Sequence, residues 1–502
     1  MKHTIPSLFI ANEKQIVSPE TLESLRFPLS EASAWITDDP AEIAARQEIF
    51  RDLLTNPELE IVFEEGKEKL DDLAELVRKS GALLPKDNES ALYALREMTV
   101  FTDAVSSLAY SGEVRSKRLT AFFSAVRSIA LDPDYTALRD WLDSLSDSLR
   151  SIRSLTLGIN LDAQLNATEA GIVSINSKPF MAGNLVERSF RRETAEAGFS
   201  TLGIIGIREN ALFLGPDKLA VDRAFYSAMN EIIRGSLRNL RRQITSDYAD
   251  GMRSLLSRAD EIGHILACVS LLRRMKEAKL PLIFPEIGEE TKILRLYSVN
   301  LADKLPVSRI VPSDIRITDD ERIFILTGPN AGGKSVFCCA LGTAQLLFQL
   351  GLPVPARSAS MCPYSKIGVH FTRESGGSSE SRFANEAARL REVLDGVDGS
   401  SLLLLDETFS STSAFDALYL AEAMIDWLLK AGCRVLYSTH LHELTAKYGS
   451  GNVPGVSCLS AKIEDGRRTY EIVPHTDDDP STSLAGDIAL ENGLGFLFGD
   501  PS

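Results

Sequence analysis

The sequence contains no pair of cysteines in the C-x-x-C spacing that zinc sites and redox motifs use. Cys338 and Cys339 are adjacent, but they lie in an apolar helical pattern. The six cysteines are otherwise scattered: Cys268, Cys338, Cys339, Cys362, Cys433 and Cys458. This usage excludes a disulfide framework, gives no indication of a zinc site, and is typical of the reducing cytosol.

Long apolar runs are also missing. Nowhere do the roughly 18 consecutive apolar residues of a membrane-spanning helix occur. The first residues, MKHTIPSLFIANEKQ, lack the apolar segment of a secretory signal. We therefore expect a cytoplasmic protein with no membrane partner.

An excess of positive charge is absent as well. The chain has 54 Lys and Arg against 70 Asp and Glu, a formal net charge of −16, and a pI near 5.0. Such a chain does not coat nucleic acid through bulk charge, so any DNA contact must be local.

The composition is that of a folded globular protein, because 44% of the 502 residues are hydrophobic and 25% are charged. At about 150 residues per domain, the length predicts about three domains. Hydrophobic spacing predicts a helical core over 1–150, a small β-containing connector over 151–216 and an α/β domain over 290–502. Between them, residues 217–289 are expected to form a long helical arm returning to the core, as either two antiparallel helices or one bent arm. The strands expected from apolar runs are Thr156–Leu161, Gly171–Ile175, Arg322–Leu326, Leu402–Leu405 and Cys433–Ser438, with helices from Lys334 and up to Lys430.

The predicted arm is locally basic. Between Tyr226 and Leu280 there are ten Lys and Arg against six Asp and Glu, a balance of +4. Four arginines lie three or four residues apart on neighbouring helical faces: Arg234, Arg238, Arg241 and Arg242. They form either an ordinary solvated helix face or a surface that contacts DNA phosphates.

The clearest motif is the run IFILTGPNAGGKS. It places G-x-x-x-x-G-K-S at Gly328, Gly333, Lys334 and Ser335, between an apolar strand and a helix. Backbone N–H groups in such a loop surround phosphates, and the helix N-terminus adds partial positive charge. Lys334 would reach the β- and γ-phosphates and Ser335 would ligate Mg²⁺. A turn without function would rarely keep both side chains.

A second motif follows about seventy residues later, where SLLLLDETFS ends an apolar run in Asp406 and Glu407. A central parallel strand that ends in two acids can supply a Mg²⁺ ligand, Asp406, and a group that positions or deprotonates water, Glu407. Alone, the pattern would also fit a strand that meets solvent. With the phosphate loop upstream, it favours hydrolysis over simple phosphoryl transfer.

A third strand, RVLYSTH, ends in His440, where a polar side chain would face a nucleotide and sense its γ-phosphate. The alternative is an ordinary loop histidine. His442 is the weaker candidate for the same role.

Together, TGPNAGGKS, LLLLDETFSSTSAFDALYLAEA and STHLHELT resemble the ATPase domain of the MutS family of DNA mismatch-repair and related proteins. The segments VPSDI and FTRESGGSSESRFANEAARL are also similar to family segments. The resemblance covers residues 290 to 450 and extends more weakly over 30 to 290, where IAARQEIFRDLL resembles the start of the family's helical core. The implied fold class is an α-helical core and lever-arm region with a small β insertion, followed by a MutS-type α/β P-loop NTPase domain of the ABC type over 290–502.

The resemblance implies roles for individual residues. Asp406 and Ser335 would hold Mg²⁺, Glu407 and Lys334 would support hydrolysis, and His440 would act as a switch histidine. Ser381, Phe383 and Glu386 match an S-x-F-x-x-E segment whose serine reaches the nucleotide of a second subunit. A homodimer with composite sites is therefore implied. The residues expected to bind ATP are Gly328, Pro329, Asn330, Ala331, Gly332, Gly333, Lys334, Ser335 and, from the partner, Ser381.

Several positions depart from the family pattern. Val336 stands where many members have Thr, and Ala331 where many have Met. Phe409, Ser410 and Ser411 replace the usual Gly-Arg-Gly, which puts the dimer-facing chemistry there in doubt. We find neither an N-terminal mismatch-reading domain with a Phe-x-Glu wedge nor an appended nuclease-like domain, so we expect a chain without them.

These observations favour a DNA-associated, Mg²⁺-dependent ATPase that switches a DNA clamp in mismatch repair or in a related recombination or repair role. A paralogue that recognises branched or unusual DNA fits the missing wedge. The alternative from another class is a nucleotide-switched protein-interaction module that does not bind DNA. An ABC-type transporter subunit or an SMC-like clasp would need a transport partner or a C-x-x-C hook, and neither is visible.

Overall fold

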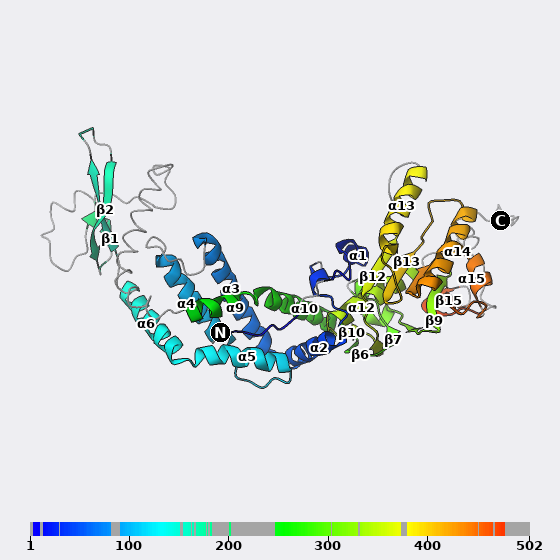
Figure 1. Ribbon diagram of the computed structural model, residues 1–502, viewed down its shortest axis with the longest axis horizontal. Helices are drawn as coiled ribbons and strands as arrows, with labels where there is room; N and C mark the ends of the chain where they lie inside the picture. The colour runs from blue at the N-terminus through cyan, green and yellow to red at the C-terminus, as the bar shows by residue number, and fades with distance from the viewer. Residues whose placement is uncertain are drawn as a thin grey trace, which may run out of the picture. The chain divides into compact units, whose positions relative to one another are not determined.

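The computed structural model divides the chain into two compact units, coloured by residue number in Figure 1. Unit 1 comprises Met1–Pro6, Glu58–Glu113 and Thr120–Gly263, and unit 2 comprises Ser7–Pro57, Val114–Leu119 and His264–Ser502. The structure describes residues 4–10, 14–29, 31–81, 91–150, 154–161, 163–164, 167–176, 178, 181–182, 200–201, 246–302, 304–329, 332–372, 379–449, 451–464 and 467–476. In these ranges no helix is both long and apolar enough to cross a bilayer.

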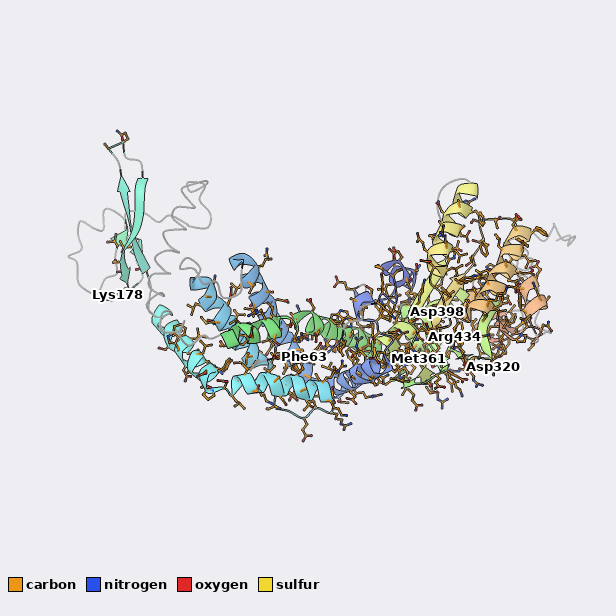
Figure 2. The ribbon with its side chains drawn as sticks, in the orientation of Figure 1. Phe63, Lys178, Asp320, Met361, Asp398 and Arg434 are labelled. Carbon is orange, nitrogen blue, oxygen red and sulfur yellow. The ribbon has the colours of Figure 1, made fainter. Side chains whose placement is uncertain are left out.

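Unit 1 is mainly helical. Its interior contains an aromatic cluster in which the ring of Phe63 lies 6.1 Å from that of Phe122 and 5.7 Å from that of Phe123 (Figure 2). A Cβ at Gly66 would lie 2.4 Å from the Leu108 side chain, so glycine allows two helices to approach closely. The helices are α3 (Glu58–Ser80), α4 (Ala91–Leu108), most of α5 (Lys117–Ala130), α6 (Pro133–Arg150) and α9 (Ser246–Leu256).

Two small β pairs also belong to unit 1. Strand β1 (Ser154–Leu161) pairs antiparallel with β2 (Ala167–Asn176), and β3 (Met181–Ala182) pairs parallel with β4 (Ser200–Thr201). The pair β1–β2 confirms the two strands that the apolar runs predicted. Helix α10 (Ala259–Glu277) follows α9 after a short break, but Arg234, Arg238, Arg241 and Arg242 all lie outside the described residues.

The start of unit 2 contains a buried charge network. Arg46 is fully buried in α2 (Pro40–Thr55), and its Nε donates to Glu42 Oε1 at 2.7 Å. Arg118 Nη2 lies 2.5 Å from the other carboxylate oxygen of Glu42. Burial acts to raise the pKa of Glu42, but the hydrogen bond from Arg118 and the charge of Arg46 outweigh it and lower the pKa. Two short helices precede α2: α1 (Pro19–Ser24) and η1 (Ala32–Trp35).

A mixed four-stranded sheet in unit 2 has the order β6-β11-β7-β8. Its strands are β6 (Glu286–Ile287), β7 (Thr291–Leu296), β8 (Ser313–Ile317) and β11 (Ser358–Met361). Two short helices, α11 (Val299–Ala302) and η3 (Val307–Arg309), connect β7 to β8, and β5 (Leu282–Ile283) pairs with β10 (Val354–Pro355).

The main sheet of unit 2 has six strands in the order β12-β13-β14-β9-β15-β16. The first five are parallel, and β16 is antiparallel to β15. Strand β14 lies between β9 and β13, so the two motif-bearing strands are not neighbours. Because parallel strands end at the same edge of a sheet, β9, β13 and β14 direct the loops that follow them to one place. The strands are β9 (Glu321–Thr327), β12 (Lys366–Phe371), β13 (Ser401–Asp406), β14 (Arg434–Ser438), β15 (Gly455–Glu464) and β16 (Arg467–Pro474).

Local sequence explains why these segments form. Every residue of β13 is buried, as expected of a leucine-rich central parallel strand. Helix α14 (Ala414–Ala431) begins at Ser413, whose hydroxyl accepts from the Asp416 N–H, and ends at Gly432 with a φ of 75°. The other helices are α12 (Lys334–Gln349), α13 (Ser379–Leu394) and α15 (Glu443–Tyr448). These elements confirm the strands and helices predicted for this part of the chain.

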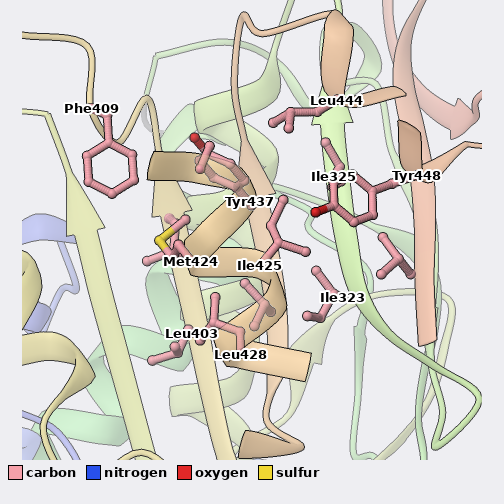
Figure 3. Packing of buried hydrophobic residues seen from close by; sticks show 14 of the residues in the cluster. Ile323, Ile325, Leu403, Phe409, Met424, Ile425, Leu428, Tyr437, Leu444 and Tyr448 are labelled. Atoms are coloured by element: carbon pink, nitrogen blue, oxygen red, sulfur yellow. The ribbon is translucent and has the colours of Figure 1, made fainter. Parts of the chain in front are cut away.

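The hydrophobic core of this region lies between the main sheet and helices α14 and α15 (Figure 3). Ile323 and Ile325 of β9 and Tyr437 of β14 face Ile425 and Leu428 of α14. Arg434 (Figure 2) starts β14 with an ion pair of 2.5 Å to Asp319. The predicted combination of helices with β-sheets is thus confirmed in its coarse form, and the order of a helical region followed by a P-loop NTPase domain stays a prediction.

Candidate functional site

The loop after β9 is shaped by glycines. Gly328 has a φ of +127° and Gly333 a φ of +95°, values that side-chain-bearing residues rarely adopt. A Cβ at Gly328 would lie 2.9 Å from Ala461 Cβ and 3.0 Å from the Ala461 nitrogen. The chain therefore needs glycine there for both conformation and space. Pro329 and Gly332 also belong to the described loop, whereas Asn330 and Ala331 lie outside it.

Lys334 begins α12 and is almost fully buried. Its Nζ donates to the carbonyl oxygens of Gly328 at 2.9 Å and Pro329 at 3.1 Å. Burial lowers the pKa of Lys334, while the nearby charges of Glu407 and Asp406 act against that change. The ammonium group thus lies inside the loop, close to both acids.

Asp406, the last residue of β13, is a buried carboxylate with spare acceptor capacity. Burial raises its pKa, and the Ser335 hydroxyl acts in the opposite direction. Among the described residues, neither Asp406 Oδ1 nor Ser438 Oγ has a hydrogen-bond partner. Unsatisfied buried oxygens of this kind call for a missing ion or water.

The Asp406 carboxylate and the neighbouring Ser335 hydroxyl fit a magnesium ion. Mg²⁺ prefers oxygen ligands and is usually bound through one or two protein groups together with substrate phosphates and water. The part of the chain that the structure describes holds no cluster of three or more His, Cys, Asp or Glu side chains suited to a metal. Asp406 and Ser335 therefore match a shared site better than a metal cage built from protein alone.

Glu407 and His440 form a hydrogen-bonded pair, with 2.7 Å between Oε1 and Nε2. Each side chain is 38% exposed, so the pair is open to solvent. The hydrogen bond from His440, with the charges of His440 and Lys334, lowers the pKa of Glu407 against the effect of burial. Since an ionised carboxylate can only accept, His440 Nε2 carries the proton of this bond.

The loop that follows Glu407 is held by contacts that the motifs do not reveal. Glu386, on α13, is 3% exposed and accepts from the Phe409 N–H at 2.7 Å. Its second oxygen accepts from both the N–H and the hydroxyl of Ser411. Thr372 donates to the carbonyl oxygens of Asp406 at 3.2 Å and Glu407 at 3.0 Å. Of the two side chains that hold this loop, Glu386 and Thr372, the sequence singled out only Glu386, and only through the S-x-F-x-x-E resemblance.

A cavity of about 560 Å³ joins several of these groups. Its lining includes Lys334, Ser335 and Glu407. Arg309 and apolar side chains such as Leu301 and Ile310 also line it. Its volume lies within the range of small-molecule sites, and its lining combines an apolar wall with a few polar groups.

Comparison with known sequences identifies this domain. The profile of MutS domain V matches residues 324–482, which contain the glycine loop, both acids and His440. A DNA mismatch repair protein MutS from Clostridium perfringens is 26% identical over 455 residues, which cover 84% of this chain and 48% of that protein. The chain belongs to the MutS family. This confirms the resemblance drawn from the motifs.

Other MutS proteins match over shorter stretches. One from Syntrophomonas wolfei is 32% identical over 220 residues, covering 42% of this chain and 25% of that protein. One from Oleidesulfovibrio alaskensis is 36% identical over 162 residues, covering 31% and 17% respectively. The chain thus spans at most about half the length of these MutS relatives.

The structure places some of the predicted site residues of this MutS chain together, and others lie outside its described part. It brings Lys334, Ser335, Asp406, Glu407 and His440 together at one edge of the main sheet. The backbone of Ser381 lies in the first turn of α13, but its side chain is outside the described part of the chain. Its contact with a second subunit stays a prediction, as do the DNA contacts of the four arginines.

Proposed function

We propose that this MutS-family chain is a Mg²⁺-dependent ATPase whose nucleotide state controls its hold on DNA. The observation that supports the ATPase most is one cavity that Lys334, Ser335 and Glu407 line together. His440 is hydrogen-bonded to Glu407, and Asp406 lies close to Ser335 and Lys334. One group for phosphate, two for metal and one for water are the parts that nucleotide hydrolysis needs.

Phosphate binding falls to the glycine loop and Lys334. The loop leads into the N-terminus of α12, where free backbone N–H groups and the helix dipole favour an anion. Among the described residues, the acceptors of the Lys334 ammonium are two neutral carbonyls. A charged phosphate oxygen is a stronger acceptor, so the β- and γ-phosphates of ATP would attract this group.

Asp406 and Ser335 would hold the magnesium ion. When bound, Mg²⁺ supplies neutralisation of the charge on the phosphate oxygens. Burial of Asp406 keeps bulk water from this carboxylate, and its unsatisfied Oδ1 leaves an acceptor free for the ion.

Glu407 would orient the attacking water and accept its proton. The lowered pKa keeps this carboxylate ionised near neutral pH, ready to accept. His440 fixes the rotamer of Glu407 through the 2.7 Å hydrogen bond. When the carboxylate takes up the proton, it becomes a weaker acceptor and the hydrogen bond from His440 weakens. Because His440 follows β14, the chemical step then changes a contact of that strand's end.

Hydrolysis and binding can be separated by two substitutions. Glu407→Gln should bind ATP with nearly unchanged affinity and hydrolyse it at least about 100-fold more slowly, because a general base contributes that much. Lys334→Ala should lose most of the binding itself. Phosphate release and titration with a fluorescent ATP analogue measure the two quantities. Glu443→Gln, which changes an exposed carboxylate on α15, is the matched control. Wild-type hydrolysis by Glu407→Gln would remove Glu407 from the mechanism.

DNA is the macromolecular partner that we propose, in mismatch repair or a related repair or recombination role. The support is family membership and the name of the relatives, DNA mismatch repair protein MutS. We also propose a homodimer in which Ser381 reaches the partner's nucleotide, and a cytoplasmic location. In such a dimer, Ser381→Arg should hinder the closing of the two subunits around bound ATP. Sedimentation of the Ser381→Arg variant combined with Glu407→Gln, in the presence of ATP, measures the dimer fraction.

One experiment tests the DNA proposal against a protein-interaction module. ATPase activity and binding are measured with homoduplex, mismatched, branched and single-stranded DNA at several salt concentrations. Phosphate contacts predict binding that weakens with salt, and neutralising Arg238, Arg241 and Arg242 should reduce the salt slope by roughly one unit for each DNA phosphate that an arginine no longer neutralises. The same triple variant with unaltered DNA binding would contradict contacts by these arginines, and no DNA binding by the wild type would favour the protein-interaction module.

A further inference from the structure

The loop from Asp406 to Ser411 contains two non-glycine residues in the left-handed region, Glu407 with a φ of 53° and Phe409 with a φ of 72°. Such a conformation is unfavourable for a residue with a side chain and persists only where contacts enforce it. The proposed base is itself one of the two. The position of its carboxylate therefore depends on whatever holds this loop.

Glu386 is the side chain that holds the C-terminal part of this loop. Its two oxygens accept the Phe409 N–H, the Ser411 N–H and the Ser411 hydroxyl. Among the described residues no lysine or arginine forms an ion pair with Glu386, although the side chain is 3% exposed. A buried carboxylate without a cationic partner needs its hydrogen bonds, and here all of the described ones come from this loop.

Other elements hold different parts of the same loop. Thr372, after β12, bonds the carbonyls of Asp406 and Glu407, and Ser438 of β14 accepts from the Glu407 N–H at 2.9 Å. These contacts fix the residues before the second left-handed position. Among the described residues, only the Glu386 side chain bonds the backbone on both sides of Ser410, at Phe409 and at Ser411.

We propose that Glu386 is a positioning residue for hydrolysis: by holding the Phe409–Ser411 backbone, it keeps Glu407 in the left-handed conformation that directs its carboxylate to His440 and the cavity. This inference rests on the proposed ATPase function. Glu386 acts through the loop and does not line the cavity.

The test compares Glu386→Gln with Glu392→Gln, an exposed glutamate of the same helix. Glutamine keeps the shape of the side chain but replaces one acceptor oxygen with a donor, so it cannot satisfy both Phe409 and Ser411. The kcat for ATP should fall about tenfold in Glu386→Gln, with the Kd of a non-hydrolysable ATP analogue changed by less than about twofold, because Lys334 and the glycine loop belong to other elements. Glu392→Gln should match the wild type.

A split between rate and binding separates positioning from general loss of structure. If Glu407 no longer points to His440 and the cavity, kcat falls while the affinity for the ATP analogue is kept, because the Lys334 contacts belong to another loop. Partial unfolding lowers both quantities together. Parallel losses of kcat and of affinity in Glu386→Gln would overturn the inference.

Ser411→Ala provides a second, milder variant in case Glu386→Gln does not fold. It removes one of the three hydrogen bonds and should lower kcat about two- to fivefold. In the double variant the two effects should be less than additive, since both act on one contact. Full additivity, or wild-type kcat in both single variants, would contradict the proposal. Absence of hydrolysis in the wild type and in Glu392→Gln would instead refute the ATPase function.

Discussion

Two loops leave the same edge of the main sheet, and they reach their shapes in different ways. The loop after β9 places glycine at both of its described positive-φ positions, Gly328 and Gly333. The loop after β13 has Glu407 and Phe409 in comparable conformations, with Glu386 and Thr372 bonded to its backbone. Glycine adopts a positive φ with little strain, so the loop after β9 needs no outside support for its conformation. The conformation of the loop after β13 depends on side chains from other elements.

This difference teaches where each loop is vulnerable. In the first, the critical contacts are local, so substitutions inside the loop should be the damaging ones. In the second, the residue that matters can lie 23 positions away in the sequence, as Glu386 does from Phe409. We assign ATP binding to the loop after β9 and catalysis to the loop after β13. Substitutions inside the first loop should therefore impair binding, and substitutions in the elements that hold the second should impair catalysis.

The largest effect is expected from crowding the glycine loop. Gly328→Ala would put a Cβ within 3.0 Å of the Ala461 backbone nitrogen at a φ of +127°. Either the glycine loop or strand β15, which contains Ala461, must then shift. A displacement near 1 Å at such a site costs on the order of 100-fold in binding or rate. We expect that loss in affinity for a fluorescent ATP analogue, measured by titration.

Gly396→Ala is the matched control for that substitution. Gly396 also has a positive φ, +65°, but a Cβ there would meet nothing within 4 Å. It should lose only about 1–2 kcal/mol of stability and bind the analogue normally. Equal losses of binding in both variants would mean that backbone strain alone, without crowding by Ala461, explains the glycine.

An intermediate effect is expected in the acid loop from removing His440. His440→Ala should lower kcat/KM roughly 100-fold. The hydrogen bond from His440 lowers the pKa of Glu407, so activity is retained above this lowered pKa and declines as the pH falls through it. Without His440 the pKa of Glu407 rises toward its ordinary value, and the decline begins at higher pH. Steady-state rates across the pH range in which circular dichroism shows a folded chain measure this shift.

His442→Ala supplies the comparison for His440. His442 lies two residues further on, and the described contacts give its ring no bond to Glu407. Replacing His442 should leave unchanged the pH at which activity declines. A shift as large as that of His440→Ala would assign the effect to general electrostatics and not to the hydrogen bond.

The two loops also differ in how far the sequence alone predicts them. G-x-x-x-x-G-K-S between an apolar strand and a helix specifies its conformation locally, and the structure has that strand, loop and helix. The position of β14 between β9 and β13 is a matter of tertiary topology that no local pattern encodes. Glu386 was visible only through family resemblance, because a single glutamate in an amphipathic helix has the same pattern as a solvated face.

One signal in the sequence did point to the strained loop. Phe409 stands where the MutS family usually has glycine, and the structure gives Phe409 the left-handed backbone that glycine adopts readily. Phe409 is 6% exposed and belongs, at its edge in Figure 3, to the hydrophobic cluster that also contains residues of β14 and α14. The side chain thus gains burial at the expense of backbone strain.

The smallest expected effect tests that balance directly. Phe409→Ala and Phe409→Gly both remove the buried ring and should each cost about 3–5 kcal/mol of stability. At most positions glycine is about 1 kcal/mol less stable than alanine, since it loses more backbone entropy on folding. At a φ of 72° alanine retains strain that glycine does not have, so Phe409→Gly should be at least as stable as Phe409→Ala. Urea unfolding followed by circular dichroism gives the difference. Alanine more stable by the usual ~1 kcal/mol would mean that the loop does not hold residue 409 in the left-handed region, and that the contrast with the glycine loop fails at the residue on which it depends most.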